Sequence, residues 1–267
     1  MKALFKLSLH FIAIFTLTAI TQIGGLIYIL TLTLTKAYRL SKLSSLGLFL
    51  VGYLVFSLLI LPIVAPAFGR TPLPLTGNLR PLNYLTCLLN RHYVRPQLKE
   101  QMEQIANRME AKFDGTKTNY LDANFPFFDR FPLLPHLSHN DGKKLDLAFY
   151  YLQNNTRTDS APSFIGYGVY DEPADGELDY PTMCREKGYF QYGLLSAFVP
   201  QWNKDDYKLD VERTVELISL LVEHQATGKV FIEPHLKERW HLNQLDKIRF
   251  HGCQAVRHDD HIHTQLQ

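Results

Sequence analysis

The chain has 267 residues, a formal net charge of +2 and 20% charged residues, which leaves room for one ordinary domain and an appendage. This near-neutral balance provides no basic patch of the kind that binds nucleic acid, so no nucleic-acid partner is expected. Three cysteines are too few for a disulfide-rich scaffold and lack CxxC spacing. Cys184 and Cys253 form one bridge in an extracytoplasmic domain, or they are buried free thiols.

The N-terminal quarter of the chain is apolar. Neither residues 7–35 nor residues 43–69 contain Asp, Glu, Lys or Arg, and each run exceeds the roughly 20 residues that span a bilayer. We therefore predict a transmembrane hairpin of two helices over residues 1–70, because the apolar core of a cleaved signal peptide is shorter.

The charges flanking the two apolar runs predict the orientation of the hairpin. The connector TKAYRLSKLSS is basic and contains no acid, which favours a cytoplasmic position for it and places both chain ends outside. Lys2 and Lys6 oppose this orientation. The prediction is a multi-pass protein of the cytoplasmic (inner) membrane with a periplasmic or extracellular C-terminal domain.

A segment rich in Pro, Gly and Asn follows the second apolar run, and we interpret residues 71–85 as a linker. The remaining residues, 86–267, are a normal length for one core. Apolar spacing predicts helices over residues 97–113 and 211–224. Short strands are predicted over residues 118–121, 145–150, 163–169, 230–233 and 261–266. Because these elements do not alternate regularly, we predict an α+β fold with a small antiparallel sheet and flanking helices.

A turn in LSHNDGKKLDLAFYY separates a histidine from a carboxylate. Asn-Asp-Gly at residues 140–142 is typical of a chain reversal, and a strand is predicted after it. Leu145 and Leu147 then face the core, so Asp146 points to the opposite side, back toward His139. Imidazole nitrogen and carboxylate oxygen both bind Zn²⁺ at about 2.0–2.2 Å. The alternative is a turn histidine beside a surface carboxylate.

The stretch RHDDHIHTQ, residues 257–265, carries three histidines and two aspartates near the C-terminus. In a strand, Ile262 and Thr264 line one side, while His261 and His263 project together from the other. With the histidine and carboxylate of the turn segment they predict a catalytic zinc site, which has three protein ligands and a water. The alternative is a solvated polar tail.

These motifs resemble those of a known family. Ser138-His139, Gly142 and Asp146, followed by HDDHIH at residues 258–263, look like the zinc motifs of the penicillin-insensitive murein endopeptidases. That family belongs to the wider group of lysostaphin-type and D-Ala-D-Ala metallopeptidases. The segment KVFIEPHLKERW is similar to the strand and short helix that precede the last motif in the family.

The resemblance implies an α+β zinc peptidase. Its implied metal ligands are His139, Asp146 and His263. His261 is implied as a catalytic histidine beside the zinc-bound water, acting as base or as transition-state stabiliser. The implied substrate is a peptidoglycan peptide, cut at an amide next to a D-amino acid.

Two further motif residues are candidates for catalysis. His258 stands where the endopeptidases have another active-site histidine, and its role is left open. Asp260 stands three positions before the last ligand, where some members of the wider group have an acidic base. Strand alternation argues against that role, because Asp260 shares the face of Ile262 in a regular strand.

The chain also departs from the family pattern. The resemblance covers residues 132–265, three cysteines cannot form the several disulfides usual in the family, and the membrane helices are not part of its pattern. The scissile bond is therefore left open. The alternative function is a non-catalytic, membrane-tethered protein that keeps the zinc fold and binds cell-wall peptide or a protein partner.

Several other polar residues have a functional and a structural interpretation. His136 either makes a hydrogen bond near His139 or lies on a surface turn. We interpret Arg257 as facing solvent rather than a substrate carboxylate, and the acidic residues 171–179 as a solvated loop rather than a calcium site. Tyr167 is interpreted as a packing residue of a sheet.

Overall fold

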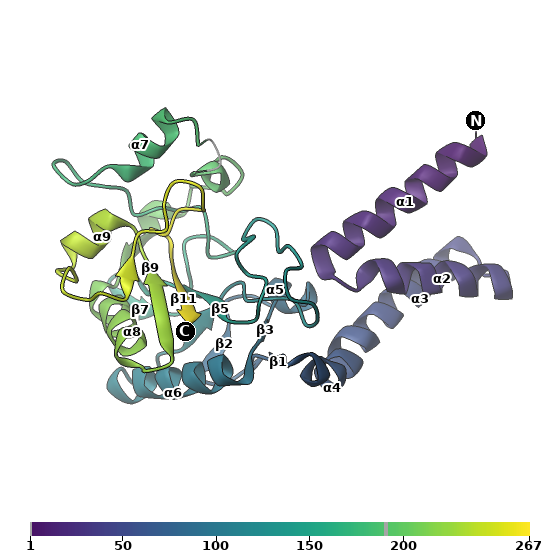
Figure 1. Cartoon of the computed structure of the whole chain (residues 1–267), viewed down its shortest axis with the longest axis horizontal. Coiled ribbons are helices and arrows are strands. Elements are labelled where there is room, and N and C mark those ends of the chain that lie inside the picture. Colours follow the sequence, from purple (N-terminus) through teal and green to yellow (C-terminus); the bar gives the residue numbers. More distant parts are fainter. Residues whose placement is uncertain (1, 190–191) are drawn as a thin grey trace.

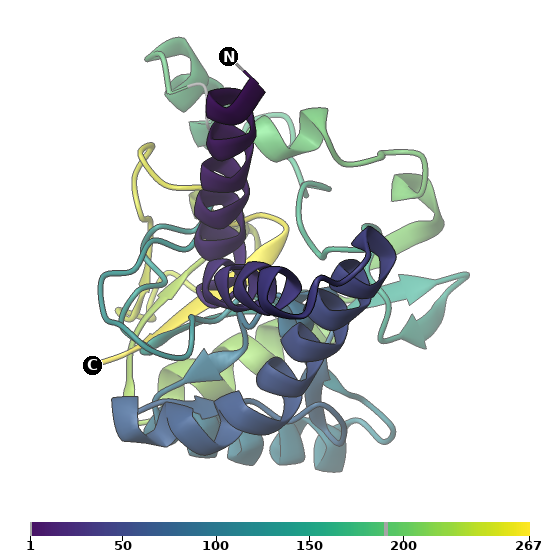
Figure 2. The same cartoon turned by 90° about the vertical axis from the view of Figure 1, so that its right-hand side faces the viewer.

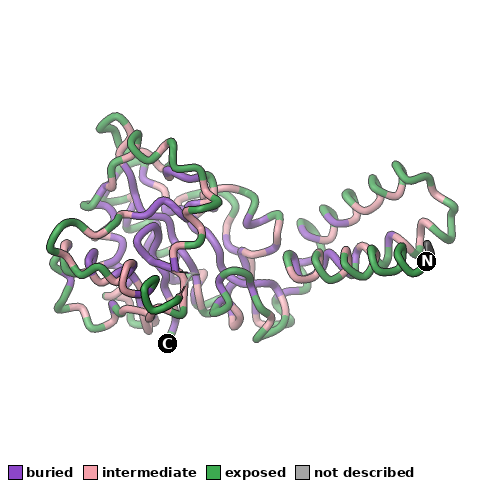
Figure 3. Tube along the Cα trace, turned by 90° about the horizontal axis from the view of Figure 1, so that it is seen from above, coloured by how far each residue is buried: buried purple, intermediate pink, exposed green. Residues whose placement is uncertain are grey.

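The computed structural model describes residues 2–189 and 192–267. In Figure 1 the N-terminal helices project as an arm from a mixed α/β domain that contains three sheets. Figure 3 shows mostly exposed residues along the arm and a buried interior in the domain. The two regions therefore differ in what covers their apolar side chains.

The arm contains three helical stretches. The first two are α1 (Lys2–Thr21) and α2 (Gly24–Tyr38). The third runs through α3 (Lys42–Val55), a π-helical turn (Phe56–Ile60), α4 (Leu61–Val64) and a 3₁₀ turn (Ala65–Phe68). The first apolar run, residues 7–35, is divided between α1 and α2, so the described part of the arm has three helical stretches where a hairpin of two helices was predicted.

A sharp elbow separates α1 from α2. Gln22 has a left-handed backbone with φ 66°, and the Gly24 N–H bonds the Thr21 hydroxyl at 2.8 Å. A Cβ at Gly25 would lie 2.0 Å from Thr18 Oγ1, so α2 can fold back onto α1 only with glycine there. An apolar run shows no trace of this break, because every residue of the elbow is uncharged.

The third stretch stays helical despite a proline in its middle. Pro62 has no N–H to donate, and its ring conflicts with the carbonyl four residues earlier in a regular α-helix. The wider π-helical turn at Phe56–Ile60 lies directly before it and relieves that conflict. As a result the helical stretch extends to the domain.

Two helical stretches are long and apolar enough to cross a membrane, namely Leu4–Thr21 and Lys42–Phe68. The 15 residues of α2 would extend about 22 Å, which is less than the roughly 30 Å of a bilayer core. Figures 1 and 3 place the N-terminus at the end of the arm that lies away from the domain. The start of α1 and the connection between α2 and α3 therefore lie at the same end of the arm, and the domain lies at the other end.

The arm is seated on the domain by buried contacts, and Figure 2 shows the molecule from the side of the arm. The Asn90 side-chain amide donates to the Thr21 carbonyl at 3.3 Å and to the Tyr53 hydroxyl at 3.1 Å. The Phe127 N–H donates to the Gln22 side chain at 3.0 Å. An apolar cluster completes the junction, formed by Ile23, Ile27, Tyr53, Leu61, Ala65 and Tyr93.

The segment expected to be a linker belongs to the domain. Its β1 (Thr71–Pro72) pairs with β3 (Tyr93–Val94), and its β2 (Leu79–Pro81) pairs in parallel with β4 (Thr118–Tyr120). Residues 71–85 therefore include two short strands, and the ends of the second, Leu79 and Pro81, are buried.

The main sheet has six strands in the order β10-β9-β11-β5-β4-β2. Its central members are β9 (Thr227–Phe231), β11 (His261–Leu266) and β5 (Lys144–Ala148), and β10 (Ile248–Arg249) lies at one edge. The two outer pairs are parallel and the inner pairs antiparallel. The sheet is thus mixed, which corrects the prediction of a small antiparallel sheet. A second sheet contains β6 (Tyr151–Gln153), β7 (Thr156–Thr158) and β8 (Tyr207–Leu209).

The predicted helices correspond to α6 (Pro96–Lys112) and α8 (Val211–Glu223), which lie along one side of the sheet in Figure 1. Shorter helices are α5 (Leu85–Leu88), α7 (Tyr180–Glu186) and α9 (Pro234–Arg239). No strand forms over residues 163–169, contrary to prediction, because Gly166 and Gly168 have φ of 80° and 83° and turn the chain.

The main sheet has a core face and a polar face. Leu145, Leu147 and Ile262 belong to the same apolar cluster as the buried residues of α6 and α8. Asp146 and His263 alternate with them and therefore point to the opposite face. The candidate site is built on that second face.

Candidate metal centre

Strand register brings the two motifs together. In the antiparallel pairing of β5 with β11, His263 lies opposite Asp146 and His261 lies opposite Ala148. Residues directly opposite each other project from the same face, which places the His263 imidazole against the Asp146 carboxylate. The predicted pairing of a turn strand with the C-terminal strand is therefore present.

The turn before β5 adds His139. Gly142 has φ 78°, and a Cβ there would lie 1.8 Å from Arg70 Nη1, so the turn needs glycine for both reasons. The His139 N–H bonds the His136 carbonyl at 2.9 Å, which holds both histidines on one tight turn beside the sheet.

Three ligand atoms converge at this point. His139 Nε2 lies 3.2 Å from Asp146 Oδ1 and 3.0 Å from His263 Nδ1, and the last two atoms are 2.9 Å apart. Tetrahedral ligands at about 2.0–2.2 Å from zinc are themselves about 3.3 Å apart. We call His139, Asp146 and His263 the first cluster. Their donor set and spacing fit a divalent metal ion.

Hydrogen bonds orient the ligand atoms of the first cluster. His139 Nδ1 donates to the Ala123 carbonyl at 2.7 Å, which leaves the Nε2 lone pair for a metal. The Tyr167 hydroxyl donates to Asp146 Oδ2 at 2.8 Å, so Oδ1 is the oxygen that faces the two imidazoles. The outer contacts therefore select one ligand atom of His139 and one of Asp146.

The charge states also suit metal binding. Burial alone would raise the pKa of Asp146, but His139, His261 and His136 outweigh it and hold that pKa well below its usual range. Burial lowers the pKa of His263 to about 4, against the opposing effect of Asp146. At neutral pH the cluster thus offers an ionised carboxylate and a neutral His263 imidazole.

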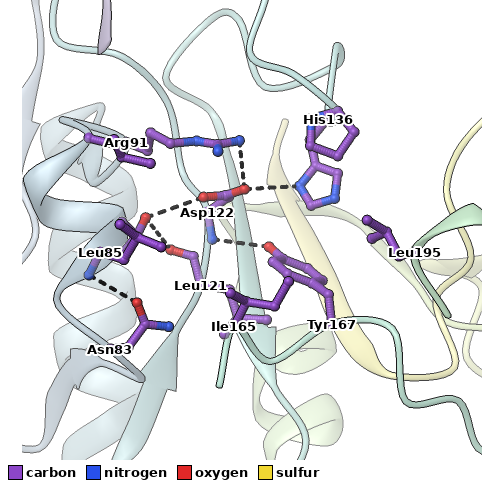
Figure 4. A pocket seen from close by; sticks show the side chains of 12 residues that line it. Asn83, Leu85, Arg91, Leu121, Asp122, His136, Ile165, Tyr167 and Leu195 are labelled. Carbon is purple, nitrogen blue, oxygen red and sulfur yellow. Dashed lines mark hydrogen bonds and ion pairs between the residues drawn. The ribbon is translucent and has the colours of Figure 1, made fainter. Parts of the chain in front are cut away.

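Figure 4 shows Arg91, Asp122 and His136 linked in a row, and this row lies behind the Asp146 carboxylate. His136 Nδ1 lies 3.0 Å from Asp146 Oδ2 and 3.4 Å from Asp122 Oδ2, and Asp122 pairs with Arg91 at 2.8 Å. Burial opposes protonation of His136, but the two carboxylates outweigh it and raise its pKa to about 9. His136 therefore forms an ion pair with both carboxylates and lies behind Asp146, close to the position that one of its two interpretations predicted.

His261 and Asp260 form a pair beside the first cluster. Asp260 Oδ1 bonds His261 Nδ1, and Asp260 Oδ2 accepts the Gly168 N–H at 2.6 Å. His261 Nε2 lies 3.7 Å from Asp146 Oδ2 and has no hydrogen-bond partner among the described residues. The Asp260 carboxylate is thus engaged on the far side of the imidazole, which gives it a positioning role.

His258 lies one step further from the first cluster. Its ring centroid is 4.7 Å from that of His261 and 5.6 Å from that of His263. Its backbone N–H donates to Glu233 Oε1 at 3.1 Å, and its ring is 4.1 Å from that of His251. We call Glu233, His251 and His258 the second cluster.

A cavity of about 560 Å³ connects these groups. It is lined by side chains of both clusters, including His139, Asp146, His251, His258 and His263. Its apolar wall includes Leu137, Leu194, Leu195 and Phe231. A smaller cavity of about 110 Å³ lies behind His136. The larger cavity gives a ligand access to both clusters.

Other residues from the sequence analysis have structural partners. Arg257 is buried, not solvent-facing, and it pairs with Asp259 and Glu172 while stacking on the Tyr170 ring. Two carboxylates of the acidic loop, Asp171 and Glu177, pair with Arg239 at 2.6 Å. Cys184 and Cys253 form a disulfide.

Within residues 2–189 and 192–267, two groups of histidine and acidic side chains could hold a metal ion. The first consists of His136, His139 and Asp146, next to which His263 completes the first cluster, and the other is the second cluster. No protein-family model matches the chain, and no curated protein sequence matches it.

Proposed function

We propose that the chain is a zinc peptidase that hydrolyses amide bonds in peptidoglycan peptides. The observation that carries this proposal is the convergence of three ligand atoms within 3.2 Å on the wall of a large cavity. A buried His261 nitrogen without a hydrogen-bond partner among the described residues lies beside them. The substrate class in this proposal comes from the motif resemblance. The arrangement of the ligand atoms and His261 supports the reaction type, amide hydrolysis.

His139, Asp146 and His263 would hold the zinc ion. When bound, zinc lowers the pKa of a coordinated water to about 7 and polarises a carbonyl oxygen. His261 Nε2 is free to accept a proton, because Asp260 holds Nδ1 and fixes the tautomer and the orientation of the ring. The same nitrogen can then return the proton to the departing amine.

The test uses the full-length protein in detergent, loaded with zinc and incubated with a muropeptide mixture. Mass spectrometry should show loss of a cross-link or of a terminal residue, and chelation should abolish the loss. A protein that binds zinc and muropeptide without any turnover would reject the peptidase and support a non-catalytic binding protein. A His241→Ala variant is the control, because this exposed histidine lies outside both clusters.

We further propose that the arm lies in the cytoplasmic membrane with the domain on its outer side. The arm contains five basic residues and no acidic one, and all five flank the end away from the domain, namely Lys2, Lys6, Lys36, Arg39 and Lys42. Basic flanks favour the cytoplasmic side. The Cys184–Cys253 disulfide is also typical of an oxidising compartment.

The orientation can be tested in intact cells with a membrane-impermeant maleimide. A His241→Cys variant should be labelled before lysis, because His241 is exposed on the domain and the native cysteines are buried or bridged. Labelling only after lysis would contradict the proposed orientation.

A further inference from the structure

The second cluster is assembled by the order of the strands. Glu233 follows β9, His251 follows β10, and His258 precedes β11. Because β9 is parallel to β10 and antiparallel to β11, the C-terminal ends of β9 and β10 and the N-terminal end of β11 lie side by side at the same end of the sheet. Three residues far apart in the chain are thereby placed together.

The side chains of the second cluster are close and buried. One ligand atom from each residue lies within 4.8 Å of the other two. Glu233 Oε1 is 3.4 Å from His251 Nε2, and the His251 and His258 rings are 4.1 Å apart. The Glu233 and His251 side chains are 0% and 5% exposed, so water cannot satisfy their polar atoms freely.

Hydrogen bonds hold the backbone and one oxygen of this cluster in place. Glu233 and His258 exchange two bonds, from the Glu233 N–H to the His258 carbonyl and from the His258 N–H to Glu233 Oε1. The Tyr192 hydroxyl donates to the same oxygen at 2.5 Å. The cluster is therefore built into the fold and does not depend on mobile surface side chains.

Three buried atoms of the cluster have no hydrogen-bond partner within residues 2–189 and 192–267, namely Glu233 Oε2, His251 Nδ1 and His258 Nδ1. An ion pair between Glu233 and His251 would balance the carboxylate charge, but it would leave Oε2 and the His258 imidazole unpaired. Buried polar atoms without partners are costly. A bound cation would relieve that cost, since a carboxylate and two imidazoles form a common zinc donor set.

We propose that Glu233, His251 and His258 bind a second divalent cation. His251 and His258 line the same cavity as the first cluster, so the two cations would face one ligand. Neighbouring metal ions that share a cavity can together bind and polarise one anionic or carbonyl group. This inference concerns metal binding and stands whether or not the first cluster cleaves peptides.

The experiment measures zinc stoichiometry in the full-length protein. The protein is stripped with chelator, saturated with Zn²⁺, desalted, and analysed by elemental mass spectrometry. The wild type should bind two zinc ions per chain. Glu233→Gln and His251→Ala should each bind one, and His263→Ala should also bind one. His241→Ala should keep two, because that residue lies outside both clusters.

Anomalous diffraction at the zinc edge then locates the ions in the wild type. Peaks at both clusters support the proposal, whereas a single peak at the first cluster overturns it. A stoichiometry of one in both the wild type and His251→Ala also overturns it. Circular dichroism identifies a variant that fails to fold, and the wild-type diffraction peaks decide the question without any variant. If the wild-type protein binds two zinc ions but cleaves no muropeptide, the proposed function is rejected and the second metal site is kept.

Discussion

The two clusters use the same side-chain chemistry on different supports. In the first cluster, Asp146 and His263 stand opposite each other on paired strands, and the register of β5 with β11 fixes their separation. In the second cluster, all three residues lie just outside strands, in connections that hydrogen bonds and a disulfide hold in place. Strand pairing therefore fixes the geometry of the first cluster directly, whereas the geometry of the second cluster depends on the hydrogen bonds and the disulfide that hold its loops.

The largest expected effect is the loss of zinc from the first cluster while the second cluster keeps its zinc. Asp146→Asn removes the only carboxylate of the first cluster and leaves two imidazoles, which bind zinc far more weakly without it. We expect zinc at the first cluster and muropeptide cleavage both to be lost, while zinc at the second cluster is kept. Metal analysis and mass spectrometry of digests measure the two outcomes. Retained cleavage in this variant would contradict the role of the first cluster.

A second prediction concerns the imidazole between the clusters. His261→Ala should leave both zinc ions bound but lower kcat by about 10²- to 10⁴-fold, because a general acid-base group contributes that much. Asp260→Asn should give a smaller loss, since the imidazole stays but loses the carboxylate that orients it. Equal kcat values for wild type and His261→Ala would reject the assignment of His261.

The disulfide should matter for the second cluster and not for the first. Cys253 is two residues after His251 and is bonded to Cys184 of α7 across a separation of 69 residues. Replacing both cysteines by serine should cost about 2–4 kcal/mol of unfolding free energy. It should also weaken zinc binding at the second cluster only. Denaturant unfolding and zinc titration test this, and an equal loss of zinc at both clusters would show that the bridge acts globally.

A buried histidine outside both clusters gives a reference for pH effects. Burial lowers the pKa of His92 from 6.5 to about 4, so below pH 6.5 the unfolded chain takes up a proton that the folded chain resists. The free energy of unfolding therefore has its full value with respect to His92 at neutral pH, and it decreases as the pH falls from about 6.5 to about 4. The loss should amount to about 3 kcal/mol.

The measurement compares unfolding free energies of wild type and His92→Gln across that pH range. The difference between the two proteins should change with pH below 6.5 and stay constant above it. A constant difference throughout would show that His92 titrates normally. Any further acid sensitivity shared by both proteins then belongs to other groups, including the buried histidines of the two clusters.

The smallest effect tests the support behind the first cluster. Tyr167→Phe removes one hydrogen bond to Asp146 Oδ2 without removing a ligand. Loss of such an outer contact should weaken zinc binding about 10-fold at the first cluster and leave the second unchanged. Tyr84→Phe is the matched control, because Tyr84 is exposed and belongs to neither cluster. Identical zinc affinities for the two variants would contradict the orienting role of Tyr167.

Local periodicity predicted that the members of the first cluster lie together, because the geometry is local to two strands, whereas the family resemblance selected His263 over His261 as the ligand. Alternation in HIHTQ placed His261 and His263 on one face, and the Asn-Asp-Gly turn placed His139 beside the strand of Asp146. The same alternation did not reveal the Asp260 contact with its neighbour His261, because Asp260 lies just before the strand begins.

Other features depend on information that no short segment carries. Glu233 and His251 meet His258 only because β10, β9 and β11 are neighbours, and strand order is a property of the whole sheet. Tyr167 reaches Asp146 from a loop that was predicted to be a strand. The elbow at Gln22 depends on the left-handed backbone of one residue, and a hydropathy pattern carries no information on backbone conformation.

The buried seat of the arm on the domain has a mechanical consequence. Since Asn90 bonds both Thr21 and Tyr53, the helices and the domain are joined by contacts and not by a slack tether. An arm embedded in lipid would then hold the mouth of the cavity at a constant height above the bilayer. Such a protein would work only on wall material within that fixed reach, however thick the wall above it becomes.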